Sequence, residues 1–314
     1  MTQIDKAQAR TDRVAQRYQR LLSDAESPHE WSYAWRREIN RGGFRAVDFL
    51  MQAVVDEGKC VGCASCLTVC PVDVFDYIDE QPKDTREQAC VQCILCVDAC
   101  PVLRPVDQDL SEFLRFRTPA KDEGYGPYAY GVYARATDDE ILARGQDGGM
   151  VSTLLIHGLQ QGTLAGAVLG DVTEEDSQIG TQTLATDRES ILACAGSRYT
   201  YSPNTIALQD AVRRNIRPLA VVGVPCQVDG VRLQQNSGIN LDLPRWYRNN
   251  VSLVIGLFCS EAFTHESIKK LAEIIEVEPS RIENINIKGK VVVRLDDGEV
   301  ITASLKKYRE FARP

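Results

Sequence analysis

The sequence lacks any long hydrophobic run. Its longest apolar stretch, residues 251–259, is interrupted by Ser252 and Gly256 and is far shorter than the roughly 20 apolar residues of a membrane-spanning helix. No hydrophobic segment of the kind found in secretory signals precedes the first cysteines. We therefore expect a cytoplasmic protein without a transmembrane segment.

Histidine is rare and the charge balance is not basic. The chain has three histidines among 314 residues, and its net charge is -8. A negative chain is a poor partner for nucleic acid, whose phosphates attract basic surfaces. The charge is compatible with a basic patch on another subunit, and equally with simple solubility. We interpret His157, which lies within an expected helix, as a packed or surface side chain rather than a catalytic one.

Cysteine, in contrast, is abundant and patterned. Eight of the eleven cysteines form two copies of C-x2-C-x2-C-x3-C followed by proline, at residues 60–71 and 90–101. This is the ligand spacing of bacterial-type ferredoxins, in which the fourth cysteine of each run binds the cluster built by the other run. The predicted ligands of a first 4Fe-4S cluster are Cys60, Cys63, Cys66 and Cys100. Those of a second cluster are Cys90, Cys93, Cys96 and Cys70.

This spacing has a physical reason. Two-residue gaps bring three thiolates to three corners of a cubane from one tight loop, while backbone N–H groups point at the sulfurs. Zinc and disulfides are the competing interpretations. Zinc sites use paired C-x2-C knuckles, often with histidine, and disulfides require an oxidising compartment, so both fit the doubled run poorly. The sequence therefore predicts a protein that moves electrons.

Around the cysteines, the pattern indicates helical segments and a linker. Residues 2–24 have apolar positions at helical spacing, which predicts an amphipathic helix that docks on a partner or on the chain's own body. A second helix is expected at 44–57. A polar linker rich in proline and charge is expected at 106–127.

From residue 128 onward the pattern alternates between strands and helices, which predicts an α/β layer structure. The expected strands are 129–134, 164–169, 219–224 and 251–258. The expected helices are 149–161, 205–214, 227–235 and 266–275. Two further runs, 291–295 and 300–304, flank Asp296-Asp297-Gly298-Glu299 and predict a β-hairpin.

Three polar clusters in this second region have the composition of binding sites. Residues 145–149 open a helix with glycines and suit an anion such as phosphate, although an aspartate cap with a flexible turn is the plain alternative. Residues 195–204 offer hydroxyls, a guanidinium and two aromatic rings, a set suited to a phosphate and a planar ring. Residues 224–227 form a strand-to-helix junction, where open α/β sheets bind ligands.

At these positions the sequence resembles a known family. The matching strings are Asp147-Gly148-Gly149-Met150-Val151-Ser152 followed by Gly162, Gly196-Ser197-Arg198-Tyr199, Ser202-Pro203-Asn204, Val224-Pro225-Cys226-Gln227 with Gly230, and Gly256-Leu257-Phe258-Cys259. In order and spacing, residues 128–314 look like the coenzyme F420 hydrogenase/dehydrogenase beta-subunit family. Members of that family contain FAD, and some carry a two-cluster ferredoxin module at the N-terminal side of the family domain.

The resemblance implies a set of cofactor-binding residues. The residues expected to contact FAD are Asp147, Gly148, Gly149, Ser152, Thr153, Ser197, Arg198, Tyr199, Ser202 and Asn204. Within this set, Arg198 is expected to hold an anionic part of the flavin or substrate. We expect Cys194, which lies outside every pattern, to be a buried helix residue.

The resemblance also makes Cys226 and Cys259 ligands of a third 4Fe-4S cluster. Here the sequence departs from the family, because a further C-x2-C pair is not present. The chain is then a fragment, or a partner completes the site, or the third cluster is absent. Two buried cysteines at strand ends are the plain alternative.

The implied activity is that of an oxidoreductase that transfers electrons between coenzyme F420, through FAD, and 4Fe-4S clusters or ferredoxin-type acceptors. F420 or ferredoxin is the expected redox partner, together with other subunits of a redox complex. One alternative is a ferredoxin-dependent flavin reductase of an organic substrate, as in relatives that reduce chlorophyll precursors. Another is an electron-wire subunit of a larger complex.

The expected fold class is α+β or α/β, with a small ferredoxin-like two-cluster domain before an α/β FAD-binding domain. The expected boundaries are a helical extension at 1–58, the two-cluster domain at 59–105, the linker at 106–127 and the FAD domain at 128–314, which lacks its C-terminal part. Length supports two domains plus a tail.

Overall fold

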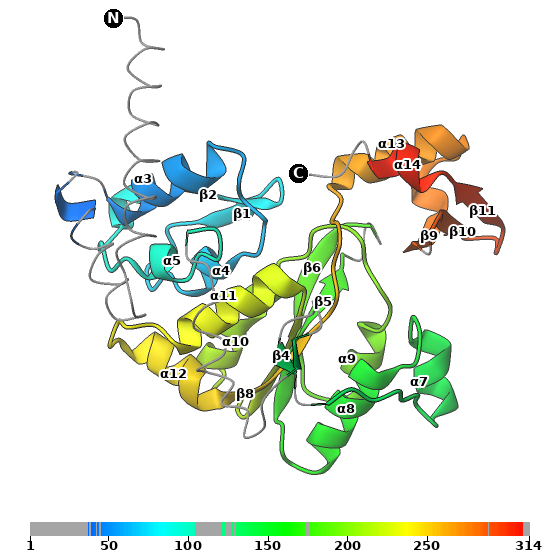
Figure 1. Cartoon of the computed structure of the whole chain (residues 1–314), viewed down its shortest axis with the longest axis horizontal. Helices are drawn as coiled ribbons and strands as arrows, with labels where there is room; N and C mark the ends of the chain where they lie inside the picture. Colours follow the sequence, from blue (N-terminus) through cyan, green and yellow to red (C-terminus); the bar gives the residue numbers. More distant parts are fainter. Residues whose placement is uncertain are drawn as a thin grey trace, which may run out of the picture.

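The computed structural model describes residues 45–103 and 130–309 except 174, 175, 177 and 288, together with residues 37, 39–41, 43, 121–122 and 127–128. The helix expected at 2–24 and most of the linker expected at 106–127 lie outside the described residues. In the described part the fold is mixed α/β and contains four separate sheets. Figure 1 shows its three main bodies.

Residues 45–103 form a small body around the two cysteine runs, here called the cysteine-rich unit. Its first helix, α3 (Ala46–Leu50), continues as a π-helical turn, Met51–Val55. Two short helices, α4 (Ser65–Thr68) and α5 (Leu95–Asp98), follow the second cysteine of each run, and a 3-10 turn spans Glu87–Ala89. Strands β1 (Asp76–Ile78) and β2 (Gln81–Lys83) pair antiparallel between the runs.

The central sheet has four strands in the order β6-β5-β7-β8. Strands β5 (Gly166–Val172), β7 (Leu219–Gly223) and β8 (Val251–Gly256) are parallel, whereas β6 (Gly180–Ala185) is an antiparallel edge. All five residues of β7 are buried, as expected for a central strand covered on both faces.

Helices cover both faces of this sheet (Figure 1). On one face lie α8 (Met150–Gln160) and α9 (Arg188–Ala193), preceded by α7 (Asp139–Arg144). On the other face lie α10 (Ala207–Arg213), α11 (Pro225–Gln235) and α12 (Asp242–Asn250). A 3-10 turn, Asn204–Ile206, leads into α10, and a two-residue pair, β3 (Lys121–Asp122) and β4 (Pro127–Tyr128), precedes the sheet.

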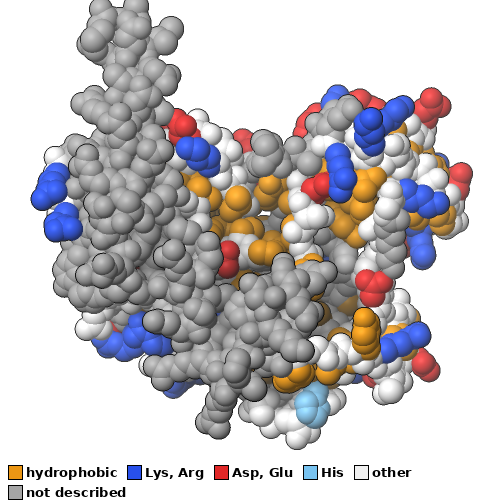
Figure 2. Space-filling model, in the orientation of Figure 1, with side chains coloured by type: hydrophobic (Ala, Val, Ile, Leu, Met, Phe, Trp, Pro, Cys, Tyr) orange, Lys and Arg blue, Asp and Glu red, His pale blue; other side chains and the backbone are white. Residues whose placement is uncertain are grey.

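The C-terminal body is a second, smaller layer structure. Strands β9 (Ile282–Ile287), β10 (Val291–Leu295) and β11 (Val300–Ala303) form an antiparallel sheet against α13 (His265–Ile275) and α14 (Leu305–Arg309), with a 3-10 turn at Pro279–Arg281. In its core the rings of Phe263 and Tyr308 stack with centroids 4.1 Å apart. Figure 2 shows a depression between this body and the cysteine-rich unit, with hydrophobic side chains on its walls.

Most elements expected from the sequence are confirmed. The apolar runs at 164–169, 219–224 and 251–258 form β5, β7 and β8, and the hairpin at 291–304 forms β10 and β11. The strand expected at 129–134 is wrong for its described residues, 130–134, which are exposed and pair with no other strand in the described part of the chain. Its alternating tyrosine and valine residues mimic a strand, but a strand needs a partner edge.

The cysteine-rich unit rests on the face of the sheet that α10, α11 and α12 cover. Val69, Leu95 and Ala99 of that unit are buried in the same apolar cluster as α10 and β7. Three side chains of the α/β body also donate hydrogen bonds to backbone carbonyls of the first cysteine run. The pairs are Thr205 Oγ1 to Cys63 O (2.8 Å), Gln209 Nε2 to Leu67 O (2.9 Å) and Tyr247 OH to Thr68 O (3.0 Å). The two bodies are therefore docked through a shared core.

Candidate redox site

The eight thiols of the two runs gather into two groups. Burial raises the pKa of the Cys66 thiol, and the neighbouring Cys63, Cys100 and Cys60 raise it further. Burial likewise raises the pKa of Cys96, with further contributions from Cys93, Cys70 and Cys90. In both groups the fourth cysteine comes from the opposite run. We call the sets 60/63/66/100 and 70/90/93/96 the first and second cage.

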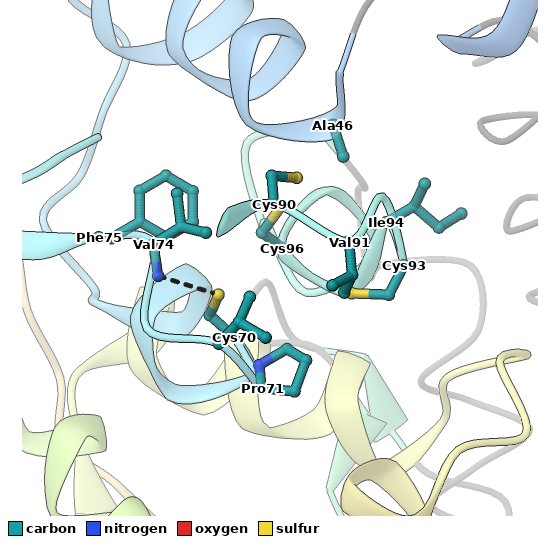
Figure 3. A pocket seen from close by; sticks show the side chains of 11 residues that line it. Ala46, Cys70, Pro71, Val74, Phe75, Cys90, Val91, Cys93, Ile94 and Cys96 are labelled. Carbon is teal, nitrogen blue, oxygen red and sulfur yellow. Dashed lines mark hydrogen bonds between the residues drawn. The ribbon is translucent and has the colours of Figure 1, made fainter. Parts of the chain in front are cut away.

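The second cage surrounds a cavity with an empty volume of about 290 Å³, part of it open to solvent. All four of its cysteines line this cavity, and the rest of the lining is apolar. Figure 3 shows the four thiols around the space, with Val74 and Phe75 beside Cys70 and with Val91 and Ile94 on the opposite run. A thiol-lined cavity with apolar walls suits a metal-sulfur cluster bound by thiolates.

Backbone geometry supports the same fit. Ala64 and Ile94 occupy equivalent positions in the two runs, and both have left-handed φ angles, 60° and 62°. This conformation turns the amides that follow, Ser65 N and Leu95 N, toward Cys63 and Cys93. Separately, Gly62 N donates to Cys60 Sγ (3.5 Å) and Val74 N donates to Cys70 Sγ (3.3 Å). N–H groups aimed at sulfur stabilise a negative cluster.

All eleven cysteines lie in the described ranges, and none of them is in a disulfide. Among the described residues, no three His, Cys, Asp or Glu side chains converge tightly enough to hold a single metal ion. A cubane is a wider body than one ion, because its four irons stand between the thiolates. The donor set of each cage, four thiols with backbone amides aimed at sulfur, fits such a cluster.

The two cages adjoin each other, and the first adjoins the α/β body. Cys96 of the second cage contributes to the raised pKa of Cys66. Burial also raises the pKa of Cys226, and the nearby thiols of Cys63 and Cys259 raise it further. Cys226 lies in the first turn of α11, after β7, and Cys259 follows β8. Both therefore stand at the carboxyl edge of the parallel strands, where open sheets bind ligands.

The glycine-rich turn at 145–149 opens α8, as the sequence predicts. Gly149 caps this helix with a φ of 67°, and a Cβ there would lie 2.7 Å from Cγ2 of Ile141, so glycine is required. Thr153 Oγ1 donates to Gly149 O at 2.9 Å, and Ser152 is buried. Of the predicted FAD residues, Asp147, Gly148 and Gly149 directly precede α8, whereas Ser152 and Thr153 lie in its first turn.

The segment 197–204 crosses the ends of three strands. Ser202 Oγ donates to Thr181 O at 2.6 Å, and Asn204 Nδ2 donates to Val222 O at 3.1 Å. Tyr199 Oη accepts from Ile287 N at 3.2 Å, which ties the segment to the C-terminal body. The side chains of Ser202, Asn204 and Tyr199 therefore hold the segment in place.

Two of the predicted binding segments meet. Ser197 N donates to Gln146 Oε1 at 3.4 Å, so the second polar cluster lies beside the glycine-rich turn. Arg198 donates to Cys194 O at 2.8 Å, and its guanidinium lies 3.9 Å from the Asp171 carboxylate at the end of β5. Arg198 is thus aimed at the carboxyl edge of the sheet and its charge is partly balanced by Asp171. Cys194 is buried at the end of α9, as expected.

Sequence reasoning did not assign the roles of three residues of this region. Asp171 gave no signal, because an aspartate at a strand end is common. Tyr201 packs against the first cage, since a Cβ at Gly62 would lie 2.7 Å from its Cδ1 atom. Ser65 is fully buried beside Cys63 and Cys66. Comparing the two cysteine runs position by position would have singled out Ser65, because its counterpart is Leu95.

Comparison with known proteins agrees with this geometry. Residues 131–209 match the family model for the N-terminal part of the coenzyme F420 hydrogenase/dehydrogenase beta subunit, and residues 216–314 match the model for its C terminus. Together the two matches cover more than half of the chain. The chain belongs to this beta-subunit family. Residues 52–124 match a 4Fe-4S dicluster domain, so the family domain here follows an iron-sulfur module.

The chain is 37% identical to the coenzyme F420 hydrogenase subunit beta of Methanococcus voltae over 58% of this chain and 64% of that protein. It is 28% identical to the coenzyme F420-dependent sulfite reductase of Methanocaldococcus jannaschii, over 83% of this chain and 40% of that protein. A solved structure of the F420-reducing [NiFe] hydrogenase complex from Methanosarcina barkeri matches with a TM-score of 0.52 and 32% identity, over 57% of this chain and 62% of that one.

The chain thus spans about two thirds of the hydrogenase beta subunit from Methanococcus voltae. Family and dicluster domain establish an iron-sulfur redox protein of an oxidoreductase family with a mixed α/β fold. Within the described ranges, no helix combines the length and the apolar character needed to span a membrane.

Proposed function

We propose that this chain is an electron-transfer subunit of an F420-linked oxidoreductase, in which FAD in the α/β body exchanges electrons with two 4Fe-4S clusters in the cysteine-rich unit. The observation that carries the proposal is the docking of the first cage at the carboxyl edge of the parallel strands. Thr205 Oγ1 donates to the Cys63 carbonyl at 2.8 Å, and Cys63 is near enough to Cys226 to raise the pKa of its thiol. Cluster and flavin would then be neighbours.

The chemistry belongs to the cofactors: when bound, FAD takes up the two electrons of a hydride and releases them singly to clusters that hold one each. The chain's own residues would bind and orient these cofactors. The first and second cages supply the eight ligands. Asp147, Gly148 and Gly149 present the start of α8, whose dipole favours a phosphate. Arg198 offers a cation close to that turn.

Cys226 and Cys259 are the two thiols available to a third cluster. Two more ligands would have to come from outside this sequence, because the remaining cysteine, Cys194, is buried at the end of α9. We therefore propose two clusters for the chain alone, with Cys226 and Cys259 as half of a site that a partner completes. Other subunits of a redox complex are the proposed partners.

The test is an anaerobic assay of the full chain. We expect reduced F420 to be consumed when a viologen is supplied as acceptor, and FAD to be released on denaturation. Arg198→Ala should lower FAD content or raise the KM for reduced F420. Arg188→Ala is the matched control, because Arg188 at the start of α9 pairs with Asp138 (2.8 Å) and Glu140 (3.0 Å) at the start of α7.

Three results would contradict the proposal in different ways. A flavin-containing protein that leaves reduced F420 untouched points to a reductase of another organic substrate. A protein with iron but no flavin points to an electron wire. Equal effects of Arg198→Ala and Arg188→Ala would remove Arg198 from the cofactor site.

A further inference from the structure

The two cysteine loops share one backbone design. In the first loop Cys63, Ala64, Ser65 and Cys66 follow one another, and in the second Cys93, Ile94, Leu95 and Cys96 do so. Ala64 and Ile94 have the same left-handed conformation, and α4 and α5 each begin at the next residue. The backbone N–H group of Ser65 hydrogen-bonds to Cys63, and that of Leu95 hydrogen-bonds to Cys93. The loops therefore differ mainly in the side chain at this position.

Ser65 carries a hydroxyl where the second loop has an apolar side chain. Its exposed fraction is 0%, and its Oγ atom has no hydrogen-bond partner among the described residues. A buried hydroxyl without a partner costs roughly 1–3 kcal/mol. Ser65 stands between Cys63 and Cys66 in the loop, and its side chain lies close to the Cys63 sulfur. An acceptor within the first cage would remove the penalty.

The Ser65 hydroxyl packs against Gly230 of helix α11. A Cβ atom built at Gly230 would lie 1.8 Å from Ser65 Oγ and 2.8 Å from Ser65 Cβ. Gly230 follows Cys226 by four residues, so both lie on the face of α11 that meets the first cage. The absence of a side chain at 230 is what leaves room for the Ser65 hydroxyl against the cysteine loop.

We propose that Ser65 tunes the first cluster: its hydroxyl donates a hydrogen bond to a sulfur of that cluster, either the Cys63 thiolate or a cluster sulfide, and raises its reduction potential. Reduction adds one electron and no bond is broken. The added negative charge strengthens a hydrogen bond to sulfur, so the donor stabilises the reduced form. The inference rests on the two clusters and is independent of FAD and F420.

The effect of the Ser65 hydroxyl on the reduction potential of the first cluster is opposite to the effect of burial. In the first cage, Cys63, Cys66 and Cys100 are buried, whereas in the second only Cys96 is. Burial disfavours added negative charge, so burial alone makes the first cluster the harder one to reduce. The Ser65 hydroxyl offsets that difference and brings the two potentials closer, which favours electron exchange between adjoining clusters in both directions.

The test is a redox titration of the anaerobically purified full chain, followed by electron paramagnetic resonance. In Ser65→Ala, we expect one of the two cluster couples to become harder to reduce by about tenfold, which is about 59 mV for one electron. The other couple and the iron content should not change. Thr68→Val is the matched control, because it removes a buried hydroxyl of the same helix that donates to Ala64 O at 3.1 Å. Thr68→Val should leave the reduction potentials of both couples unchanged.

The reciprocal variant assigns the affected cluster. Leu95→Ser should make the other couple easier to reduce and leave unchanged the one that Ser65→Ala shifts. The proposal is overturned if Ser65→Ala leaves both couples unchanged or moves them equally. It is also overturned if Thr68→Val produces the same shift, or if the two variants act on the same couple.

Discussion

The contact between Gly230 and Ser65 yields a prediction about how the two bodies dock. Replacing Gly230 with alanine improves helix propensity by about 1 kcal/mol. The added Cβ would lie 1.8 Å from Ser65 Oγ and 2.8 Å from Ser65 Cβ, and Ser65 is fully buried. Rotation of the hydroxyl alone would leave the close approach to Ser65 Cβ. Overpacking of this kind costs about 1–3 kcal/mol. Taking the upper end for so short an approach, Gly230→Ala should destabilise the chain by about 2 kcal/mol.

The double variant Ser65→Gly/Gly230→Ala is the control. It removes the Ser65 side chain on one side of the interface and adds a methyl group on the other. The nearest remaining atom to the new Cβ is then Ala99 O at 3.7 Å, an ordinary contact. The clash is relieved, so the double variant should be more stable than Gly230→Ala alone, although glycine in α4 costs about 1 kcal/mol.

Thermal unfolding under anaerobic conditions, with cluster absorbance as a second probe, measures both variants. A loss of about 2 kcal/mol lowers the midpoint by roughly 4–8 °C, on the scale that applies to large domains. The reasoning is refuted if Gly230→Ala is as stable as the parent chain. It is also refuted if Ser65→Gly lowers stability equally with and without Gly230→Ala, because the two positions would then be uncoupled.

Three further predictions follow from the docking, the helix caps and the cages. Tyr247→Phe removes the buried hydroxyl that donates to Thr68 O, and should lower the free energy of unfolding by about 1 kcal/mol, as measured by denaturant titration. Backbone and side-chain hydrogen bonds from Ser190 lower the pKa of Asp187, the cap of α9. A lowered folded pKa gives stability that is present above the unfolded value of about 3.9 and is lost as the pH falls below it, so Asp187→Asn should flatten the acid side of a plot of unfolding midpoint against pH. Cys96→Ser should remove about four irons per chain, whereas Cys194→Ser should remove none.

Each of these predictions has a contrary outcome. An unchanged denaturation curve for Tyr247→Phe would mean that the hydroxyl does not contribute to docking. If the unfolding midpoint of Asp187→Asn falls with acid as steeply as that of the parent chain, the Asp187 cap does not contribute to the pH dependence. Equal iron loss in the two cysteine variants would show that the cages are not the ligand sets.

Parts of the fold followed directly from the sequence. Strands β5 and β7 are runs of apolar residues with little ambiguity, and the Asp-Asp-Gly-Glu turn marks the β10–β11 hairpin. Strand β6 was missed because Gly180–Ala185 is polar and lies at the sheet edge, where only one neighbour pairs with it. Helix α12 was missed because Pro244 stands in its first turn, which a helix tolerates but a pattern search penalises.

The candidate site was predictable where local spacing determines it. The cage membership depends on cysteine spacing, and the structure brings together the sets that the ferredoxin pattern predicts. The docking of the first cage on α11 was not predictable, because it pairs residues far apart in the sequence, such as Thr205 with Cys63. The contacts of Arg198 with Asp171 are likewise tertiary, so the residues proposed for FAD stay a prediction.

The most direct test of the account is the metal and sulfide content of the full chain purified without oxygen. Two thiolate cages predict about eight irons and about eight sulfides per chain, with the spectrum of 4Fe-4S clusters. A preparation that holds zinc, or one that contains no acid-labile sulfide after anaerobic handling, would contradict the presence of the clusters and therefore the electron-transfer role.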